Sequence, residues 1–75
     1  MNIMDNGRKD RNGVVVEVGD RVHFSTGPDE RVLDTFGKVI SIHDNADVAW
    51  IWIEGKTWEE GKYSKFLSHV VKVLP

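Results

Sequence analysis

The alternation of hydrophobic and polar positions predicts short β-strands along most of the chain. Alternate valines in residues 14–18 share one parity, and Phe24 continues that parity beyond a break at Gly19. This pattern indicates a strand, a kink and a second short strand. The charged segment at residues 26–36 has strong turn residues and no periodicity, so we expect a long loop there and a candidate for function.

The rest of the pattern predicts an all-β domain. The expected elements are strands at 37–42 and 48–53, a short strand around Thr57 and Trp58, one helical turn at 64–67 and a last strand at 70–73. Asn45 suits a positive φ angle in the first connection, and Glu54-Gly55 forms the next turn. Five short strands favour a small closed barrel, because a narrow open sheet buries one face and leaves two open edges.

One predicted strand, VAWIWI, breaks the rule that a strand with one wet face alternates apolar and polar residues. Positions 49–53 are apolar in succession, which leaves no polar face. Something must therefore cover the second face of this strand. The candidates are the protein's own chain, a second copy of it, or a ligand.

Two orientations of this strand are open. In the first, Trp50 and Trp52 fill the barrel. Ile51 and Ile53 then face outward as the centre of an exposed patch, unless residues 14–18 fold over them as a sixth short strand or lid. In the second, the tryptophans face out and form an aromatic platform. In both, this strand is the best candidate for a protein-binding surface, with Ile51, Ile53, Trp50 and Trp52 as the contact residues.

Four segments resemble the small SH3-like barrels of the KOW and Tudor-like kind. They are VGDRVHF, FGKVISI, VAWIWIEG and YSKFLSHVVKV, within residues 14–74. The resemblance implies a five-stranded SH3-like barrel with one short helical turn before the last strand. In it, Gly19 would lie in a turn, Trp50 and Trp52 would point inward, and Leu67 would plug the helical turn.

Size and charge narrow the function classes. The chain has 75 residues, no cysteine and a formal net charge of -2. Residues 13–75 are expected to form the one domain, and the polar residues 1–12 a flexible lead-in. The acidic balance disfavours a protein that mainly covers nucleic-acid phosphates, and the domains of this kind that bind RNA are usually basic. Together with the apolar outward positions of the VAWIWI strand, this balance favours contact with protein.

A nucleic-acid interface is the alternative interpretation. Basic residues near strand ends approach each other on one rim of a small barrel, where lysines hold phosphates and interleaved aromatic residues stack bases. The residues predicted for such an interface are Lys38, Lys56, Trp58, Lys62, Tyr63 and Lys65. Nearby glutamates offset these charges, so ordinary solubilising charge competes with this interpretation.

An aromatic cage for a methylated lysine or arginine is a further, minor hypothesis. Its members would be Phe36, Trp58, Tyr63 and Phe66, with Glu59 and Glu60 to complement the cation. Aromatic residues in so small a barrel more often belong to the core or plug turns, which is the competing interpretation.

Catalytic chemistry has little support in the sequence. His23, His43 and His69 lie on separate predicted elements, without a neighbouring nucleophile motif or metal-ligand spacing. We therefore expect no enzyme activity, no metal, no cofactor and no small-molecule substrate. The expected partners are a protein or a second copy of the chain, with nucleic acid as the alternative and no membrane. No apolar run approaches the roughly 20 residues that cross a bilayer, which favours a cytoplasmic location.

Overall fold

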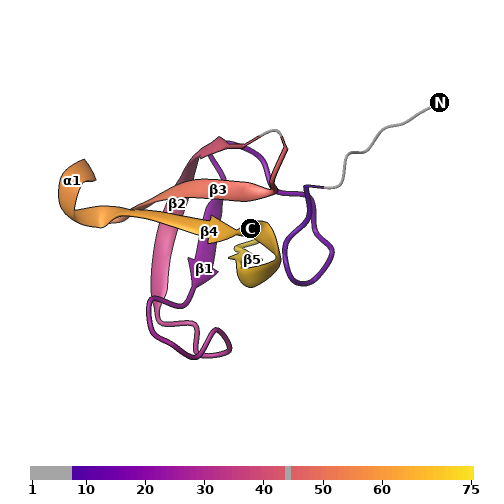
Figure 1. Ribbon diagram of the computed structural model, residues 1–75, viewed down its shortest axis with the longest axis horizontal. Helices are drawn as coiled ribbons and strands as arrows, with labels where there is room; N and C mark the ends of the chain where they lie inside the picture. Colours follow the sequence, from indigo (N-terminus) through magenta and orange to yellow (C-terminus); the bar gives the residue numbers. More distant parts are fainter. Residues whose placement is uncertain (1–7, 44) are drawn as a thin grey trace.

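The computed structural model describes residues 8–43 and 45–75 and contains one antiparallel sheet (Figure 1). The elements are β1 (Arg21–Phe24), β2 (Thr35–Ile42), β3 (Val48–Ile53), α1 (Trp58–Gly61), β4 (Lys62–Phe66), the 3-10 helix η1 (Leu67–His69) and β5 (Val71–Lys72). The strand order is β4-β3-β2-β1-β5, so the last strand pairs with the first. The prediction of an all-β fold with five strands and a helical turn before the last strand is confirmed. Among the residues described, no helix has the length and apolar character needed to cross a membrane.

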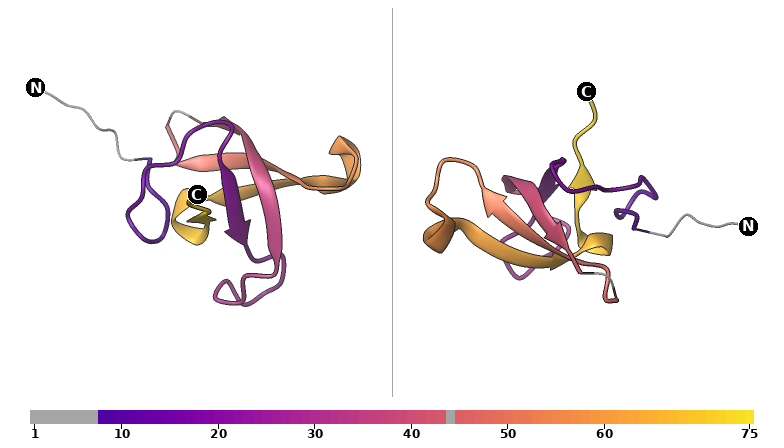
Figure 2. Two further views of the ribbon diagram at one scale, coloured as in Figure 1. Left: turned by 180° about the vertical axis from the view of Figure 1, so that it is seen from behind. Right: turned by 90° about the horizontal axis from the view of Figure 1, so that it is seen from above.

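The sheet is curved but not closed, and the prediction of a closed barrel is wrong in this respect. β4 and β5 are the two ends of the strand order and do not pair with each other. β5 has only two paired residues, which it uses to bond β1. The opening is filled by side chains instead, because Leu67 of η1 and Val70 are both fully buried. Figure 2 shows how the chain turns through η1 to reach β5.

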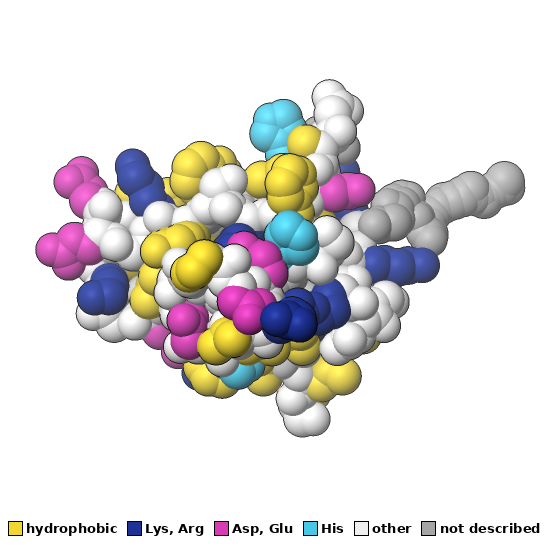
Figure 3. Space-filling view, turned by 60° about the horizontal axis from the view of Figure 1, so that its bottom comes forward, with side chains coloured by type: hydrophobic (Ala, Val, Ile, Leu, Met, Phe, Trp, Pro, Cys, Tyr) yellow, Lys and Arg dark blue, Asp and Glu magenta, His cyan; other side chains and the backbone are white. Residues whose placement is uncertain are grey.

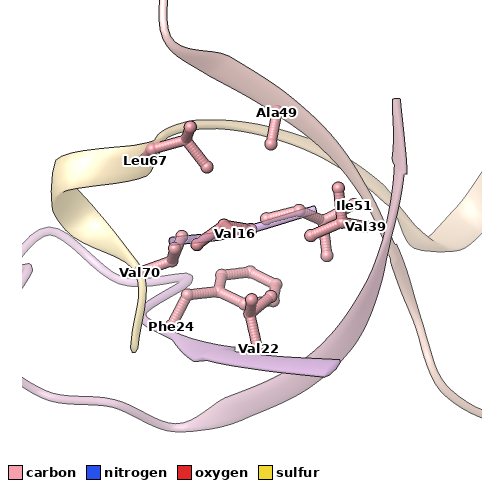
Figure 4. Close-up of a cluster of buried hydrophobic side chains, with 8 residues drawn as sticks. All are labelled: Val16, Val22, Phe24, Val39, Ala49, Ile51, Leu67 and Val70. Carbon is pink, nitrogen blue, oxygen red and sulfur yellow. The ribbon is translucent and has the colours of Figure 1, made fainter. Parts of the chain in front are cut away.

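A small hydrophobic core lies on the concave side of the sheet (Figure 4). Its members are Val16, Val22, Phe24, Val39, Ala49, Ile51, Leu67 and Val70, each at most 1% exposed. The sheet approaches this core closely at Gly37, where an added Cβ atom would lie 2.5 Å from Cγ2 of Ile51 and 2.8 Å from the carbonyl oxygen of Trp52. Position 37 therefore requires glycine, since any side chain would displace β3.

The structure corrects the first orientation considered for the VAWIWI strand. Ala49 and Ile51 point into the core and are fully buried, whereas Trp50 is 40% exposed on the opposite face. Ile53 is half-buried against the core, so an exposed Ile51 and Ile53 patch does not form. The core is too small for two indoles, and an indole N–H needs an acceptor. Trp52 finds one outside the core, where its Nε1–H donates to the Lys56 carbonyl oxygen at 2.7 Å.

The segment before β1 is also organised differently from the prediction. Residues 14–18 form no strand beyond an isolated bridge between Lys9 and Val15. Only Val16 joins the core, while Val15 and Val18 are 49% and 60% exposed. The segment thus reaches the core by one side chain and does not act as a lid over β3.

Part of the segment expected to be a flexible lead-in is bonded to the rest of the structure. Asp10 is only 5% exposed, and its carboxylate accepts the backbone amides of Asn12, Val14 and Lys72. Residues 8–12 therefore belong to the fold. Residues 1–7, the rest of the predicted lead-in, lie outside the described residues.

Three local predictions after β2 are wrong and one is confirmed. The positive φ angle falls on Asp47, at 51°, rather than on Asn45, whereas Gly55 has the expected turn geometry with φ 88°. Thr57 and Trp58 form no strand. Thr57 caps α1 instead, because its hydroxyl oxygen accepts the amide of Glu60. The strand begins only at residue 62, and it occupies most of the segment where a helical turn was expected.

Candidate interaction surface on the outer face of the sheet

The convex side of the sheet, here called the outer face, carries the side chains that alternate with the core residues. Lys38 of β2 lies opposite Trp52 of β3, and Trp52 lies opposite Lys62 of β4. Arg21 of β1 lies opposite Lys38 and extends the row. One row across four strands therefore holds three basic residues and one indole. Trp50 lies two residues before Trp52, opposite Ser64.

A shallow pocket of about 200 Å³ opens next to this row. It is lined by Ile40, Ser41, Trp50, Trp58 and Lys62. The rings of Trp50 and Trp58 meet at 57° with centroids 6.4 Å apart, so they form two walls of a corner. Trp58 is the first residue of α1, which connects β3 to β4 at one end of the sheet and contacts β3 (Figure 1). Trp50, Trp58 and Ile40 are each about 40% exposed, so the pocket presents apolar surface to solvent.

The opposite end of the outer face is occupied by a stacked cluster. The Phe36 ring lies parallel to the His23 ring, with centroids 4.0 Å apart. The Arg21 guanidinium lies 4.2 Å from the Phe36 centroid and donates two hydrogen bonds to Glu54, at 2.7 and 3.1 Å. These hydrogen bonds hold the pKa of Glu54 below its ordinary value and raise the pKa of Arg21. Arg21 and Phe36 are thus engaged with their neighbours and are less open to a ligand than the pocket.

The structure gathers only part of the predicted nucleic-acid interface. Lys38, Trp58 and Lys62 share the outer face, and Lys56 lies beside it through the bond from Trp52. Tyr63 and Lys65 alternate to the other face of β4. There the Tyr63 ring packs against Phe24, with centroids 5.8 Å apart.

Lys65 is held away from the outer face by an ion pair. Its ammonium bonds both carboxylate oxygens of Glu30, at 2.8 and 2.9 Å, and its side chain is only 11% exposed. The hydrogen bond from Lys65 holds the pKa of Glu30 below its ordinary value, and the positive charge of Arg11 acts in the same direction. Lys65 is therefore not available to a nucleic acid in this conformation.

The predicted aromatic cage does not form. Phe36 stacks on His23, Trp58 faces Trp50, and Tyr63 packs inward. The Phe66 ring meets the His69 ring nearly at a right angle, with centroids 5.8 Å apart. The four aromatic residues thus lie in four different environments, because β4 sends Tyr63 and Phe66 to opposite faces.

The loop between β1 and β2, proposed from sequence as a functional segment, is tied by its own hydrogen bonds. The buried Ser25 hydroxyl donates to the Asp29 carbonyl oxygen at 2.9 Å and accepts the Gly27 amide. The Asp34 carboxylate accepts the backbone amide of Thr26 and the hydroxyl of Thr35, and these bonds keep the pKa of Asp34 below its ordinary value. This loop is a preformed surface element that flanks β1, away from the pocket.

The histidines are not brought together. His23 belongs to the stacked cluster, while Nδ1 of His69 lies 3.8 Å from the Glu30 carboxylate. His43 pairs through its backbone amide with Val48 in the β2 to β3 turn. In the described part of the chain, no group of three His, Cys, Asp or Glu side chains is arranged to hold a metal ion.

Ile40 and Ser41 complete the pocket and were not among the residues predicted from the sequence. Phe66 was predicted only as a member of the aromatic cage, whereas it is 55% exposed at the end of the edge strand β4. The alternation in the segment KYSKF could have revealed its exposed face, because residues 62, 64 and 66 share one parity. On the side of the molecule seen in Figure 3, hydrophobic patches are interspersed with charges of both signs. Comparison with known protein families, characterised proteins and solved structures finds no match to this chain.

Proposed function

We propose that this chain is a non-enzymatic protein-interaction module, and that its pocket receives an aromatic or large aliphatic side chain of a protein partner. The observation that carries the proposal is the corner of Trp50 and Trp58 beside Ile40, which leaves three large apolar side chains open to solvent. Exposed Trp side chains at the centre of an apolar patch are typical anchors of protein interfaces.

The size of the pocket supports a side chain as its ligand. Pockets for drug-sized molecules and cofactors usually enclose about 300–1,000 Å³. The pocket here has about 200 Å³ and is open to one side, which suits one inserted side chain. Its one charged lining residue, Lys62, lies at the edge and favours an acidic or aromatic neighbour on the partner.

The resemblance to small SH3-like barrels forms part of this proposal. The short 3-10 helix before the last strand, with Leu67 fully buried, supports it. The sheet differs from that pattern because it is open between β4 and β5. A fold of this kind does not by itself specify a ligand, so the proposal rests on the pocket.

Single-stranded nucleic acid is the second candidate ligand, favoured by the row of Arg21, Lys38, Trp52 and Lys62. A cationic row beside exposed indoles is suited to phosphates and stacked bases. Against it, Arg21 is already paired with Glu54, and Glu59 and Glu60 extend from the same turn as Trp58. Protein is therefore the first choice.

The proposal is tested by peptide selection. The protein, immobilised at low density, is used to select binders from a phage-displayed library of random peptides. We expect enriched peptides to share an aromatic or large aliphatic residue, and to lose at least about tenfold in affinity when Trp50 or Trp58 is replaced by alanine. The matched control is Val32→Ala, which removes a side chain 56% exposed in the β1 to β2 loop.

The outcomes separate the two candidate ligands. Peptides that bind the Trp58→Ala variant as tightly as the unchanged protein would refute the pocket as the binding site. The same protein is titrated with oligodeoxythymidylate at low and moderate salt. Binding that requires Lys38 and Lys62 and weakens steeply with salt would favour nucleic acid over protein.

A further inference from the structure

β4 is an edge strand whose outward backbone groups have no partner within residues 8–43 and 45–75. The amide of Leu67 donates to the Asp47 carbonyl oxygen at 2.8 Å, in the same register that sets Phe66 opposite Val48. Because hydrogen-bonded pairs alternate along an antiparallel ladder, Tyr63 and Lys65 exchange bonds with β3. The amides of residues 64 and 66 and the carbonyl groups of residues 62 and 64 then point away from the sheet.

We propose that a second copy of this chain binds β4, so that the two β4 strands pair antiparallel about a two-fold axis at Ser64. This inference rests on the proposed function, because it names the partner that fills the pocket. In this register Ser64 lies opposite the partner's Ser64, and Lys62 lies opposite the partner's Phe66. The outward groups then face each other: each Ser64 amide meets the partner's Ser64 carbonyl group, and each Phe66 amide meets the partner's Lys62 carbonyl group.

The side chains of the outer face complement one another in the same register. Phe66 is 55% exposed and shares its parity with Lys62, which lines the pocket. Directly opposite residues lie on the same face of a sheet, with Cβ atoms about 5 Å apart. The partner's Phe66 is therefore delivered to the mouth of the Trp50 and Trp58 pocket. The two-fold axis repeats this contact, as a closed dimer requires.

The charges along β4 favour this register over the register that is shifted by one residue. Lys62 faces an aromatic ring, which a cation favours. On the inner face, Tyr63 faces the partner's Lys65, whose charge is already paired with Glu30. A shift by one residue would set Lys62 opposite the partner's Lys65 and direct the outward backbone groups past one another. The side chains of β4 are thus complementary to those of a second β4 strand that pairs with it in the antiparallel direction.

The first test uses the full chain in sedimentation velocity over a wide concentration range, with Ser64→Pro and Ser64→Thr as the matched pair. The Ser64 amide takes no part in bonding to β3, so proline is tolerated there as on other edge strands. We expect Ser64→Pro to raise the dissociation constant of the dimer by about thirtyfold, because two symmetry-related hydrogen bonds are lost. Ser64→Thr keeps the amide and should dimerise normally. If the protein without substitutions stays monomeric over the whole concentration range, the proposed dimer is refuted.

A second test reads the register directly. The chain has no cysteine, so single cysteines report contacts without background. Opposed Cα atoms of a hydrogen-bonded pair lie about 5.5 Å apart, within disulfide range. Ser64→Cys should form a covalent dimer on mild oxidation, whereas Ser68→Cys, on the exposed surface of η1, should not. Equal cross-linking of the two variants would refute the register.

The pocket contact has its own readout, which separates this inference from the proposed function. Phe66→Ala and Trp58→Ala should each weaken the dimer at least about tenfold, and Leu74→Ala, which trims an exposed side chain outside β4, should not. A monomer whose peptide binding still requires Trp58 refutes the dimer and leaves the proposed function intact. If the protein dimerises and cross-links at position 64, but neither Phe66→Ala nor Trp58→Ala weakens the dimer, the pocket is refuted as part of the dimer contact.

Discussion

The carboxylate of Asp10 accepts the backbone amide of Lys72 at 2.7 Å, across 62 positions of the chain. The same carboxylate accepts the amides of Asn12 and Val14, so it joins the first described segment to the last strand. β5 has only two residues paired with β1, and the Asp10 bond adds a third anchor for it. Asp10 thus holds the edge strand β5 in place, where apolar packing alone would hold it weakly.

Replacement of Asp10 by alanine should therefore destabilise the whole fold. We expect the free energy of unfolding to fall by about 2–4 kcal/mol, because three amides lose a charged acceptor in a water-poor site. Urea denaturation followed by circular dichroism measures the change. Glu17→Ala, at an exposed carboxylate whose side chain makes no bond in the described part of the structure, serves as the control. An equal loss in both variants would contradict the role assigned to Asp10.

Substitutions on β3 should have opposite effects on its two faces. Ile51→Glu places a charge in the core without a partner, at a cost of several kcal/mol, comparable with the whole stability of a small domain. We expect this variant to be unfolded. Trp50→Glu changes the outer face and should give a folded protein with a dispersed amide NMR spectrum. A folded Ile51→Glu variant would restore the orientation first considered from the sequence.

Gly37→Ala should lower the free energy of unfolding by about 1–3 kcal/mol through overpacking. The new methyl group would meet Cγ2 of Ile51 and the backbone of Trp52, and backbone cannot rotate away. Thermal unfolding measures the effect, with Gly27→Ala as the control because an added Cβ atom there meets nothing within 4 Å. A wild-type melting temperature for Gly37→Ala would show that β3 yields more easily than its packing indicates.

Acid should weaken the fold through Glu30 and Glu54. Their partners Lys65 and Arg21 hold the pKa of each carboxylate below its ordinary value in the folded protein. A carboxylate whose pKa is lower in the folded than in the unfolded protein stabilises the fold. This stabilisation is fully present above the pKa of the unfolded state, and it is lost as the pH falls through the pKa of the folded state. The urea midpoint should thus decline from about pH 4.5 downward.

Lys65→Met tests the Glu30 part of this dependence. The variant should be less stable than the unchanged protein at pH 7, and the difference should shrink as Glu30 becomes protonated in acid. A difference that stays constant from pH 7 to pH 3 would mean that Lys65 acts through its packing and not through its charge.

The turn at Gly55 and the strands β2 and β3 could be predicted from the sequence because local chemistry determines them. Gly55 requires its positive φ wherever the strands lie, and a helical turn precedes the last strand as expected, although η1 begins three residues later than predicted. The buried face of β3 could not be predicted, since positions 49–53 are apolar on both sides. The choice depended on the volume of the core and on an acceptor for the indole of Trp52, and both are tertiary properties.

The candidate site was only partly predictable for the same reason. Trp50, Trp58 and Lys62 were candidates from their residue types, but their meeting at one pocket depends on α1, where a strand was expected. Asp10 was missed because hydrophobic periodicity carries no signal for a carboxylate that caps backbone amides. Lys65 was included among the residues predicted for a nucleic-acid interface, because its ion pair with Glu30 joins residues 35 positions apart and cannot be read from the local sequence.

The burial of the Lys65 ammonium against Glu30 also gives the chain an internal chemical reporter. Amine-acylating reagents attack the neutral, accessible form of a lysine, so they should modify exposed Lys38, Lys56 and Lys62 well before Lys65. Glu30 belongs to the β1 to β2 loop, and any departure of that loop from β4 would release the ammonium. The acylation rate at this one side chain, followed by mass spectrometry, thus measures how often the loop opens.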